Sequence, residues 1–156
     1  MLMSKQSHKV SNQDAGFSLI EVLIALLVLS IGLLGLALLQ VESIKYNTDA
    51  YFRTQATILA YDIMDRMKAN KAVANAGGYQ AVASPADPAC GGSTPCADTT
   101  LLAAYDLLTW YANLSALLPT DPANPSKITS VGNVHTIEVH WTERGISKQR
   151  IWTIEL

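Results

Sequence analysis

The chain has 156 residues, about the length of one domain, and its 11 basic and 13 acidic residues give a net charge of −2. Because the balance is slightly acidic and no basic run is present, binding to nucleic acid through its phosphates is not expected. Residues 42–156 leave about 115 positions for a head, and a head of this size buries proportionally little surface.

The first 15 residues are short, polar and irregular. Lys5 and Lys9 are their fixed positive charges, and Asp14 is their one acid. Positive charge just before an apolar run predicts a cytoplasmic N-terminus and a translocated C-terminal part.

An apolar run of 20 residues, Val22 to Val41, carries no charge, and Ser30 and Gln40 are its polar breaks. As a helix it would span about 30 Å, the thickness of a bilayer core. A buried core helix fits poorly, because such helices usually have a polar face. The run therefore predicts a transmembrane helix. Gly32 and Gly35 interrupt it, either as tolerated small residues or as points of close packing or bending.

An ordinary secretory signal peptide is the alternative interpretation of this run. Cleavage would then follow a small-x-small site such as Gly35-Leu36-Ala37. Three features count against it: the run is longer than a usual signal core, Glu21 interrupts its start, and the apolar pattern continues past the site.

Glu21 is the unusual residue, because an acid in an apolar helix costs on the order of 3 kcal/mol at the bilayer centre and less near its edge. One interpretation places it among the headgroups, solvated and without a role. The other requires cleavage after Gly16, which would give Phe17 a free amine. Phe17 and Glu21 are spaced i, i+4 on one helix face, so the carboxylate would neutralise an amine of its own or a neighbouring chain.

The stretch Gly16-Phe17-Ser18-Leu19-Ile20-Glu21, directly followed by the apolar run, resembles the class III leader of the type IV pilin family. The resemblance implies cleavage between Gly16 and Phe17 by prepilin peptidase, N-methylation of Phe17, and a role for Glu21 in subunit docking. It also implies three regions: a leader peptide (1–16), a transmembrane and filament-core helix (17–41), and a periplasmic head (42–156).

Beyond Val41 an amphipathic pattern predicts that the helix begun at Phe17 continues to about Asn70. Acids precede bases at i, i+4 in two expected ion pairs, Asp49–Arg53 and Asp62–Arg66. The apolar stripe expected to pack under the head consists of Ile44, Phe52, Ala56, Leu59, Ile63 and Met67.

The segment Ala60 to Val73, AYDIMDRMKANKAV, resembles the DRM-(K/R)-AN stretch of the PilV-type minor pilins, also called type IV pilus modification proteins. In that family the stretch closes the long helix. A cysteine-containing loop, a second helix with a tryptophan and C-terminal strands follow, as they do in this sequence. Pseudopilins of type II secretion share the leader and much of the apolar run.

Two cysteines, Cys90 and Cys96, lie in a loop rich in glycine and proline. Zinc binding needs more ligands, and C-x5-C is not a redox C-x-x-C pair. With the C-terminal part outside the cytoplasm, a disulfide worth roughly 2 kcal/mol is expected. Two free thiols are the alternative, and either state is structural.

The remaining pattern predicts an α+β fold of pilin type, in which a small antiparallel sheet lies across the long helix. A second helix is expected over Thr99–Leu118, and a hairpin over His135–Thr142 and Arg150–Leu156, with a further strand near Lys127–Val131. The apolar stripe expected for the second helix consists of Ala104, Leu107, Leu108, Tyr111, Leu114 and Leu118.

No catalytic pattern is evident. His135 and His140 are an odd number of residues apart, so on one strand they face opposite sides and cannot share a metal. Phosphate-binding loops, HExxH and nucleophile elbows are missing from the sequence. We therefore expect no enzymatic activity, no cofactor and no metal site, and we expect Trp110, Trp141 and Trp152 to be core residues.

The resemblance implies a minor pilin that acts in type IV pilus assembly or initiation, and hence in twitching motility and adhesion. Its expected partners are prepilin peptidase, other minor pilins, the major pilin and the assembly platform. It is expected in the inner membrane with a periplasmic head, and then in the filament or its tip. The alternatives are a minor pseudopilin of type II secretion and a membrane-anchored periplasmic binding module.

Overall fold

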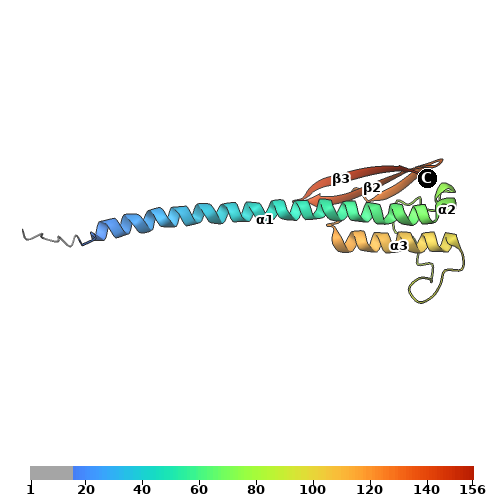
Figure 1. Ribbon diagram of the computed structural model, residues 1–156, viewed down its shortest axis with the longest axis horizontal. Coiled ribbons are helices and arrows are strands. Elements are labelled where there is room, and N and C mark those ends of the chain that lie inside the picture. The colour runs from blue at the N-terminus through green and yellow to red at the C-terminus, as the bar shows by residue number, and fades with distance from the viewer. Residues whose placement is uncertain (1–15) are drawn as a thin grey trace, which may run out of the picture. The chain divides into compact units, whose positions relative to one another are not determined.

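The computed structural model describes residues 16–156, so the leader expected for residues 1–16 lies outside the described residues except for Gly16. The architecture is α+β and pilin-like, with a long N-terminal helix, a further helix and a small antiparallel sheet (Figure 1). Its elements are α1 (Leu19–Ala69), α2 (Lys71–Asn75), α3 (Thr99–Leu117), β1 (Lys127–Val131), β2 (Val134–Glu143) and β3 (Ile146–Glu155).

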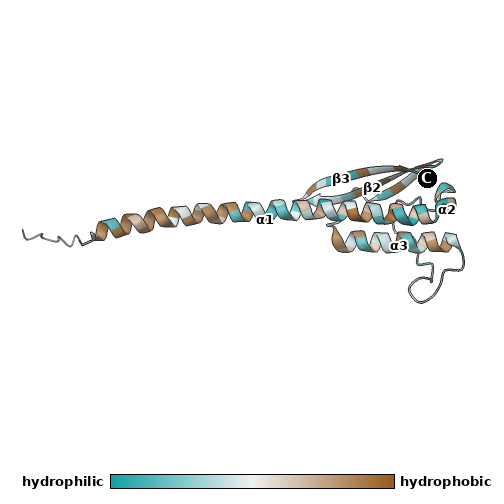
Figure 2. Cartoon of the chain, in the orientation of Figure 1, coloured by the Kyte–Doolittle hydropathy of each residue, from teal (hydrophilic) through white to brown (hydrophobic). Residues whose placement is uncertain are grey.

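The chain divides into two compact units, one ending at Ile44 and one comprising Lys45–Leu156. In the first unit the large apolar side chains from Leu19 to Val41 are between 47% and 85% exposed. Hydrophobic residues dominate this part of α1 (Figure 2). By length and composition α1 is able to cross a membrane, and it is the one helix among residues 16–156 of which this is true.

In the second unit α1 lies between the sheet and α3 (Figure 1). Four of the six residues predicted for its apolar stripe are buried, whereas Phe52 is half-buried and Ile44, which belongs to the first unit, is 65% exposed. The buried face of α1 consists of Ala56, Leu59, Ala60, Ile63, Met64 and Met67.

The helix α3 begins and ends close to the predicted bounds, but its buried face is rotated. The Oδ1 atom of Asp98 accepts hydrogen bonds from the backbone N–H groups of Thr100 and Leu101, each 2.8 Å long, and so caps the helix. The indole of Trp110 donates to the carbonyl of Leu59 at 3.0 Å, which turns this side of α3 toward α1. Its buried residues are therefore Ala103, Asp106, Leu107, Trp110 and Leu114. Of the predicted stripe, Leu107, Leu114 and Leu118 are buried, whereas Ala104, Leu108 and Tyr111 are half-buried.

The sheet has the order β1-β2-β3, and both strand pairs are antiparallel. One face of β2 is buried as predicted, with Ile137, Val139 and Trp141 in the core. The strand β3 begins at Ile146, four residues before the predicted Arg150, because a two-residue turn at Arg144-Gly145 keeps the pairing continuous from Glu143↔Ile146 onward. Trp152 on β3 is only half-buried against the core.

One of the two predicted ion pairs on α1 is present, and the other is replaced. Arg66 binds Asp62 at 3.1 Å, as predicted. Arg53, however, binds Glu143, and Asp49 binds Arg144 at 2.7 Å, so the expected Asp49–Arg53 pair is wrong.

The physical reason for this exchange is the position of the β2–β3 turn. It brings Glu143 and Arg144 next to α1. The Glu143 side chain is only 2% exposed. A buried carboxylate is more costly to leave unpaired than a carboxylate on the surface, so Arg53 pairs with Glu143.

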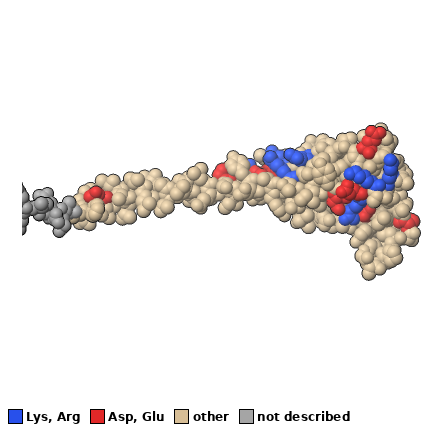
Figure 3. All heavy atoms as spheres, in the orientation of Figure 1, with Lys and Arg blue, Asp and Glu red and all other residues tan. Residues whose placement is uncertain are grey.

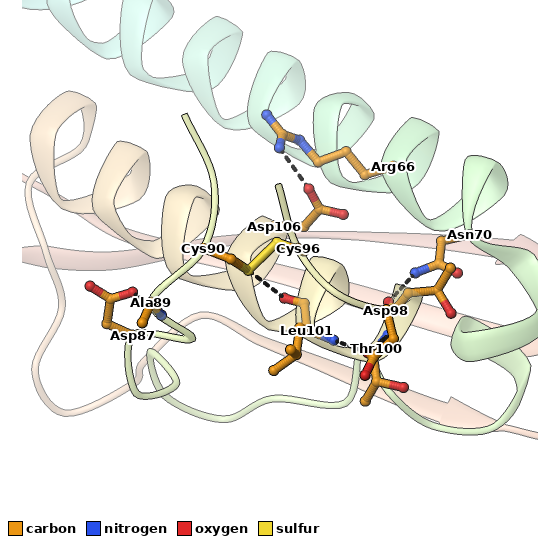
Figure 4. The surroundings of a disulfide bond; sticks show 11 residues. Arg66, Asn70, Asp87, Ala89, Cys90, Cys96, Asp98, Thr100, Leu101 and Asp106 are labelled. Atoms are coloured by element: carbon orange, nitrogen blue, oxygen red, sulfur yellow. Dashed lines mark hydrogen bonds and ion pairs between the residues drawn. A yellow bond between two sulfur atoms is a disulfide. The ribbon is translucent and has the colours of Figure 1, made fainter. Parts of the chain in front are cut away.

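The stretch that closes α1 is held by contacts to α3 (Figure 4). Arg66 donates to Asp106 at 2.9 Å, the buried Met67 enters the core, and the amide of Asn70 donates to the carbonyl of Thr99 at 2.7 Å. Beside this contact Cys90 and Cys96 form the predicted disulfide.

Candidate processing and assembly site

The segment that carries the expected cleavage point lies before the first helix. Gly16, Phe17 and Ser18 have no regular secondary structure, and α1 begins at Leu19. A Cβ built on Gly16 would have nothing within 4 Å, and Phe17 is 83% exposed. The peptide bond between Gly16 and Phe17 is therefore accessible and is not held in a helical hydrogen-bond ladder.

Ser18 fixes the start of the helix. Its Oγ accepts a hydrogen bond from the N–H of Ile20 at 3.3 Å, and its carbonyl accepts from the N–H of Glu21 at 3.0 Å. A serine at the N-cap followed three residues later by a glutamate has the pattern of a capping box. Sequence reasoning missed Ser18, although the spacing Ser18-x-x-Glu21 was the available signal.

Glu21 lies in the first turn of α1, where the unpaired N–H groups carry partial positive charge and favour an acid. It shares a shallow open hollow on the helix surface with Phe17, so the two predicted site residues lie on the same side. The other residues that line this hollow are Val22, Ala25, Leu26 and Leu29.

The position of Phe17 determines the electrostatic environment of an N-terminal amine created there by cleavage. A chain cut after Gly16 would place an ammonium group two residues before the helix start, next to the positive end of the helix dipole. That charge is unfavourable in an apolar environment unless an anion compensates it. The carboxylate of Glu21 is the one acid between Gly16 and Val41 that is able to do so.

The run that follows presents an apolar surface with almost no polar groups. Space-filling atoms show charge at the start of α1 and then none over the next part of the helix (Figure 3). The hydroxyl of Ser30 donates to the carbonyl of Leu26 at 2.7 Å, so this polar group is satisfied inside the helix. Exposed apolar surfaces of this size are typical of contacts with a membrane or with other protein.

Gly32 and Gly35 have no neighbouring atom within 4 Å of an added Cβ. Within residues 16–156, therefore, no close contact requires a glycine at either position. Whether they bend the helix stays a prediction.

Elsewhere, the structure keeps the two histidines of β2 apart. His135 is fully buried on the core face, and His140 lies on the opposite face, as their spacing predicted. Among residues 16–156 no group of three or more His, Cys, Asp or Glu side chains is arranged to hold a metal ion.

Residues 11–37 match the family model described as the prokaryotic N-terminal methylation motif. The match spans 27 of the 156 residues and contains Gly16, Phe17 and Glu21. This motif indicates a type IV pilin or pseudopilin that is processed by prepilin peptidase. No curated protein and no solved structure matches the chain.

Proposed function

We propose that this chain is a minor pilin that takes part in the assembly or initiation of a type IV pilus. The observation that carries the proposal is the arrangement at the start of α1. An accessible Gly16–Phe17 bond, a capped helix start and Glu21 in the first turn directly precede a charge-free helix surface that nothing in the described chain covers.

The proposed mechanism begins in the membrane, where lipid covers the apolar run. Prepilin peptidase cleaves between Gly16 and Phe17, and the new amine of Phe17 is methylated. The subunit then leaves the lipid and enters a bundle of similar helices. In this bundle the carboxylate of Glu21 neutralises the Phe17 amine of a neighbouring subunit, so that neither charge is buried alone.

The resemblance of the stretch around Arg66 to the PilV-type minor pilins supports the finer assignment. The structure gives that stretch a role in packing, because Arg66 joins α1 to α3 through Asp106. The proposed partners are other minor pilins, the major pilin and the assembly platform, in the inner membrane and then in the filament. We propose no catalytic role for any described residue.

Mass spectrometry of the N-terminus, in cells with and without prepilin peptidase, tests the first step. The expected mature chain begins at N-methylated Phe17, and only when the peptidase is present. A chain that begins after Ala37, or one that keeps Met1, would remove the amine that Glu21 is proposed to meet and would end the filament interpretation.

A charge-neutral substitution tests the second step. Glu21→Gln keeps the shape and is expected to leave processing intact while the amount of chain in sheared filaments falls at least about tenfold. The matched control is Asp65→Asn, which removes an acid from an exposed position on the same helix. Loss of twitching in a strain without the gene supports the pilus, whereas loss of protein secretion indicates the pseudopilin alternative.

A further inference from the structure

The second unit carries a basic pocket where α1 meets the edge of the sheet. In the described sheet β3 is an edge strand, and its core face borders the pocket (Figure 1). The pocket has a volume of about 210 Å³, and its lining residues are Arg53 of α1, Trp141 and Glu143 of β2, and Lys148, Gln149 and Arg150 of β3.

The register of the sheet places two cations of β3 side by side in this pocket. Lys148 is opposite Trp141, and Arg150 is opposite Val139, so both belong to the face that covers the core. They are two positions apart on one strand, which separates their Cα atoms by about 7 Å. Arg150 is exposed and Lys148 is half-buried, so both charged groups are accessible from solvent.

The charges in the pocket do not balance. Glu143 is its one acid, and the carboxylate oxygens of Glu143 already accept hydrogen bonds from Arg53 and from the indole of Trp141. Within residues 16–156 neither Lys148 nor Arg150 has a carboxylate oxygen within 4 Å. Three cations around one anion leave a formal charge of +2 here, although the whole chain carries −2.

Most other basic side chains of the second unit are neutralised by a nearby acid. The pairs are Arg66 with Asp62 and Asp106, Lys68 with Asp65, Lys127 with Glu138, and Arg144 with Asp49. A long polyanion such as nucleic acid requires a tract of cations along the surface. The distribution of charge therefore favours one small anion in the pocket.

We infer that this pocket binds a single dianionic phosphate group, either inorganic phosphate or the phosphate of a monoester. Such a group carries close to two negative charges at neutral pH and has three strongly accepting oxygens. The ammonium of Lys148 has three N–H donors, and the guanidinium of Arg150 has five in a planar fork. A carboxylate would bring one charge and would neutralise only one of these two cations.

The size of the pocket also selects a small ligand. Pockets for drug-sized molecules have volumes of about 300–1,000 Å³. A pocket of about 210 Å³ is smaller than these and suits one phosphate group with a short substituent. The inference does not depend on the proposed function, because it uses no residue of the processing and assembly site.

A titration followed by ³¹P nuclear magnetic resonance tests the inference on the full chain in uncharged detergent. Inorganic phosphate and glycerol phosphate are added at constant ionic strength, and line broadening gives their dissociation constants. Lys148→Gln and Arg150→Gln are each expected to weaken binding at least about tenfold, whereas Arg150→Lys keeps the charge and retains most of the affinity. The matched control is Lys71→Gln, which removes an exposed cation of α2 and leaves binding unchanged. Circular dichroism verifies that the variants fold.

A second titration, with phosphatidic acid in mixed micelles, distinguishes a lipid source from a soluble one. Binding of phosphatidic acid but not of glycerol phosphate, lost in Lys148→Gln, would support the site and assign its phosphate to a lipid headgroup. Three results would overturn the inference: no binding of any phosphate compound, equal affinity for sulfate, and an equal loss of binding in Lys71→Gln. None of them affects the proposed function, which the N-terminus of the mature chain tests separately.

Discussion

Arg53 on α1 holds the carboxylate of Glu143 through two hydrogen bonds, from Nε and from Nη2, each 3.1 Å long. Glu143 ends β2 and is 3% exposed, and the indole of Trp141 donates to the same carboxylate at 3.0 Å. The hydrogen bonds from Arg53 lower the pKa of Glu143, because they favour its ionised form. The tip of the hairpin is thus attached to α1 through a buried anion.

The first prediction is that Arg53→Met weakens this attachment in a pH-dependent way. A lowered pKa means that the unfolded chain binds the proton more tightly, so the stabilisation is complete above the ordinary pKa of 4.5 and is lost as pH falls through the pKa of the folded chain. We expect a lower unfolding temperature at pH 7 for the variant and a smaller further loss in acid. Thermal unfolding of the full chain in detergent, followed by near-ultraviolet circular dichroism from pH 7 to pH 3, measures both.

Lys68→Met is the matched control, since it removes an exposed cation from the same helix, and within residues 16–156 the ion pair of that cation is with the exposed Asp65. Its unfolding temperature should stay close to that of the unmodified chain at every pH. If Arg53→Met behaved like this control, the attachment of the hairpin to α1 would not depend on the ion pair.

The second prediction concerns Asp106, whose carboxylate joins α3 to α1 and to the turn that follows α2. It accepts from Arg66 at 2.9 Å and from the hydroxyl of the fully buried Tyr79 at 2.6 Å. Asp106→Leu would leave both donors without this acceptor, and we expect a loss of about 3 kcal/mol in the free energy of unfolding. Tyr79→Phe removes only one hydrogen bond and should cost about 1 kcal/mol. Urea unfolding of the full chain in detergent measures both, and equal losses would contradict the shared role.

The hydrophobic pattern of the sequence was sufficient to predict the long helix, but it did not predict which residues the helix contacts. The apolar run and the amphipathic repeat that follows it predicted a helix from Phe17 to about Asn70, and α1 extends from Leu19 to Ala69. The bond between Arg53 and Glu143 joins positions 90 residues apart, and no local spacing indicates such a bond.

The buried face of the second helix was predicted only in part, for a similar reason: three of the six stripe residues are buried, and the buried Ala103 and Asp106 were not among them. Its sequence is apolar over most of its surface, so several faces fitted a buried stripe. Tertiary contacts decided between them: the indole of Trp110 faces Leu59, and Asp106 enters the interior because Arg66 meets it there. At the candidate site, by contrast, Gly16, Phe17 and Glu21 are close in sequence, so spacing alone was enough to group them.

The third prediction compares two neighbouring glycines in the disulfide-closed loop. Gly91 and Gly92 both have positive φ angles, +109° and +59°. A Cβ on Gly91 would overlap the ring of Tyr105, whereas a Cβ on Gly92 would meet nothing within 4 Å. Gly92→Ala should therefore cost about 1 kcal/mol from backbone strain alone. Gly91→Ala should cost a further 1–3 kcal/mol or so, because the loop must move away from α3.

Urea unfolding of the oxidised chain compares the two glycine variants directly. Both keep the disulfide, so the difference between them reports the contact with Tyr105 together with the larger backbone strain at Gly91, whose φ of +109° lies outside the left-handed region open to alanine. Equal losses would show that the loop moves away from the ring at no cost.

The fourth prediction is a loss of stability in mild acid that depends on His135. The imidazole is fully buried, with Nδ1 2.6 Å from the hydroxyl of Ser130 and Nε2 3.1 Å from the amide oxygen of Asn75. Because an amide oxygen only accepts, the contact with Asn75 requires a proton on Nε2, and burial favours the neutral form of the ring. Burial lowers the pKa of His135 below its ordinary value of 6.5, because charge is disfavoured away from water.

The unfolded chain therefore takes up this proton first, and the folded state loses stability as pH falls below 6.5 toward the pKa of the folded chain. In His135→Gln this component of the pH dependence should disappear between about pH 6.5 and pH 5, although the variant is less stable than the unmodified chain at pH 7.5. His140→Gln, on the opposite face of β2, should keep it. Unfolding temperatures of the three full-length chains at pH 7.5, 6.5 and 5.5 decide the matter. An unchanged slope in His135→Gln would mean that another group takes up the proton.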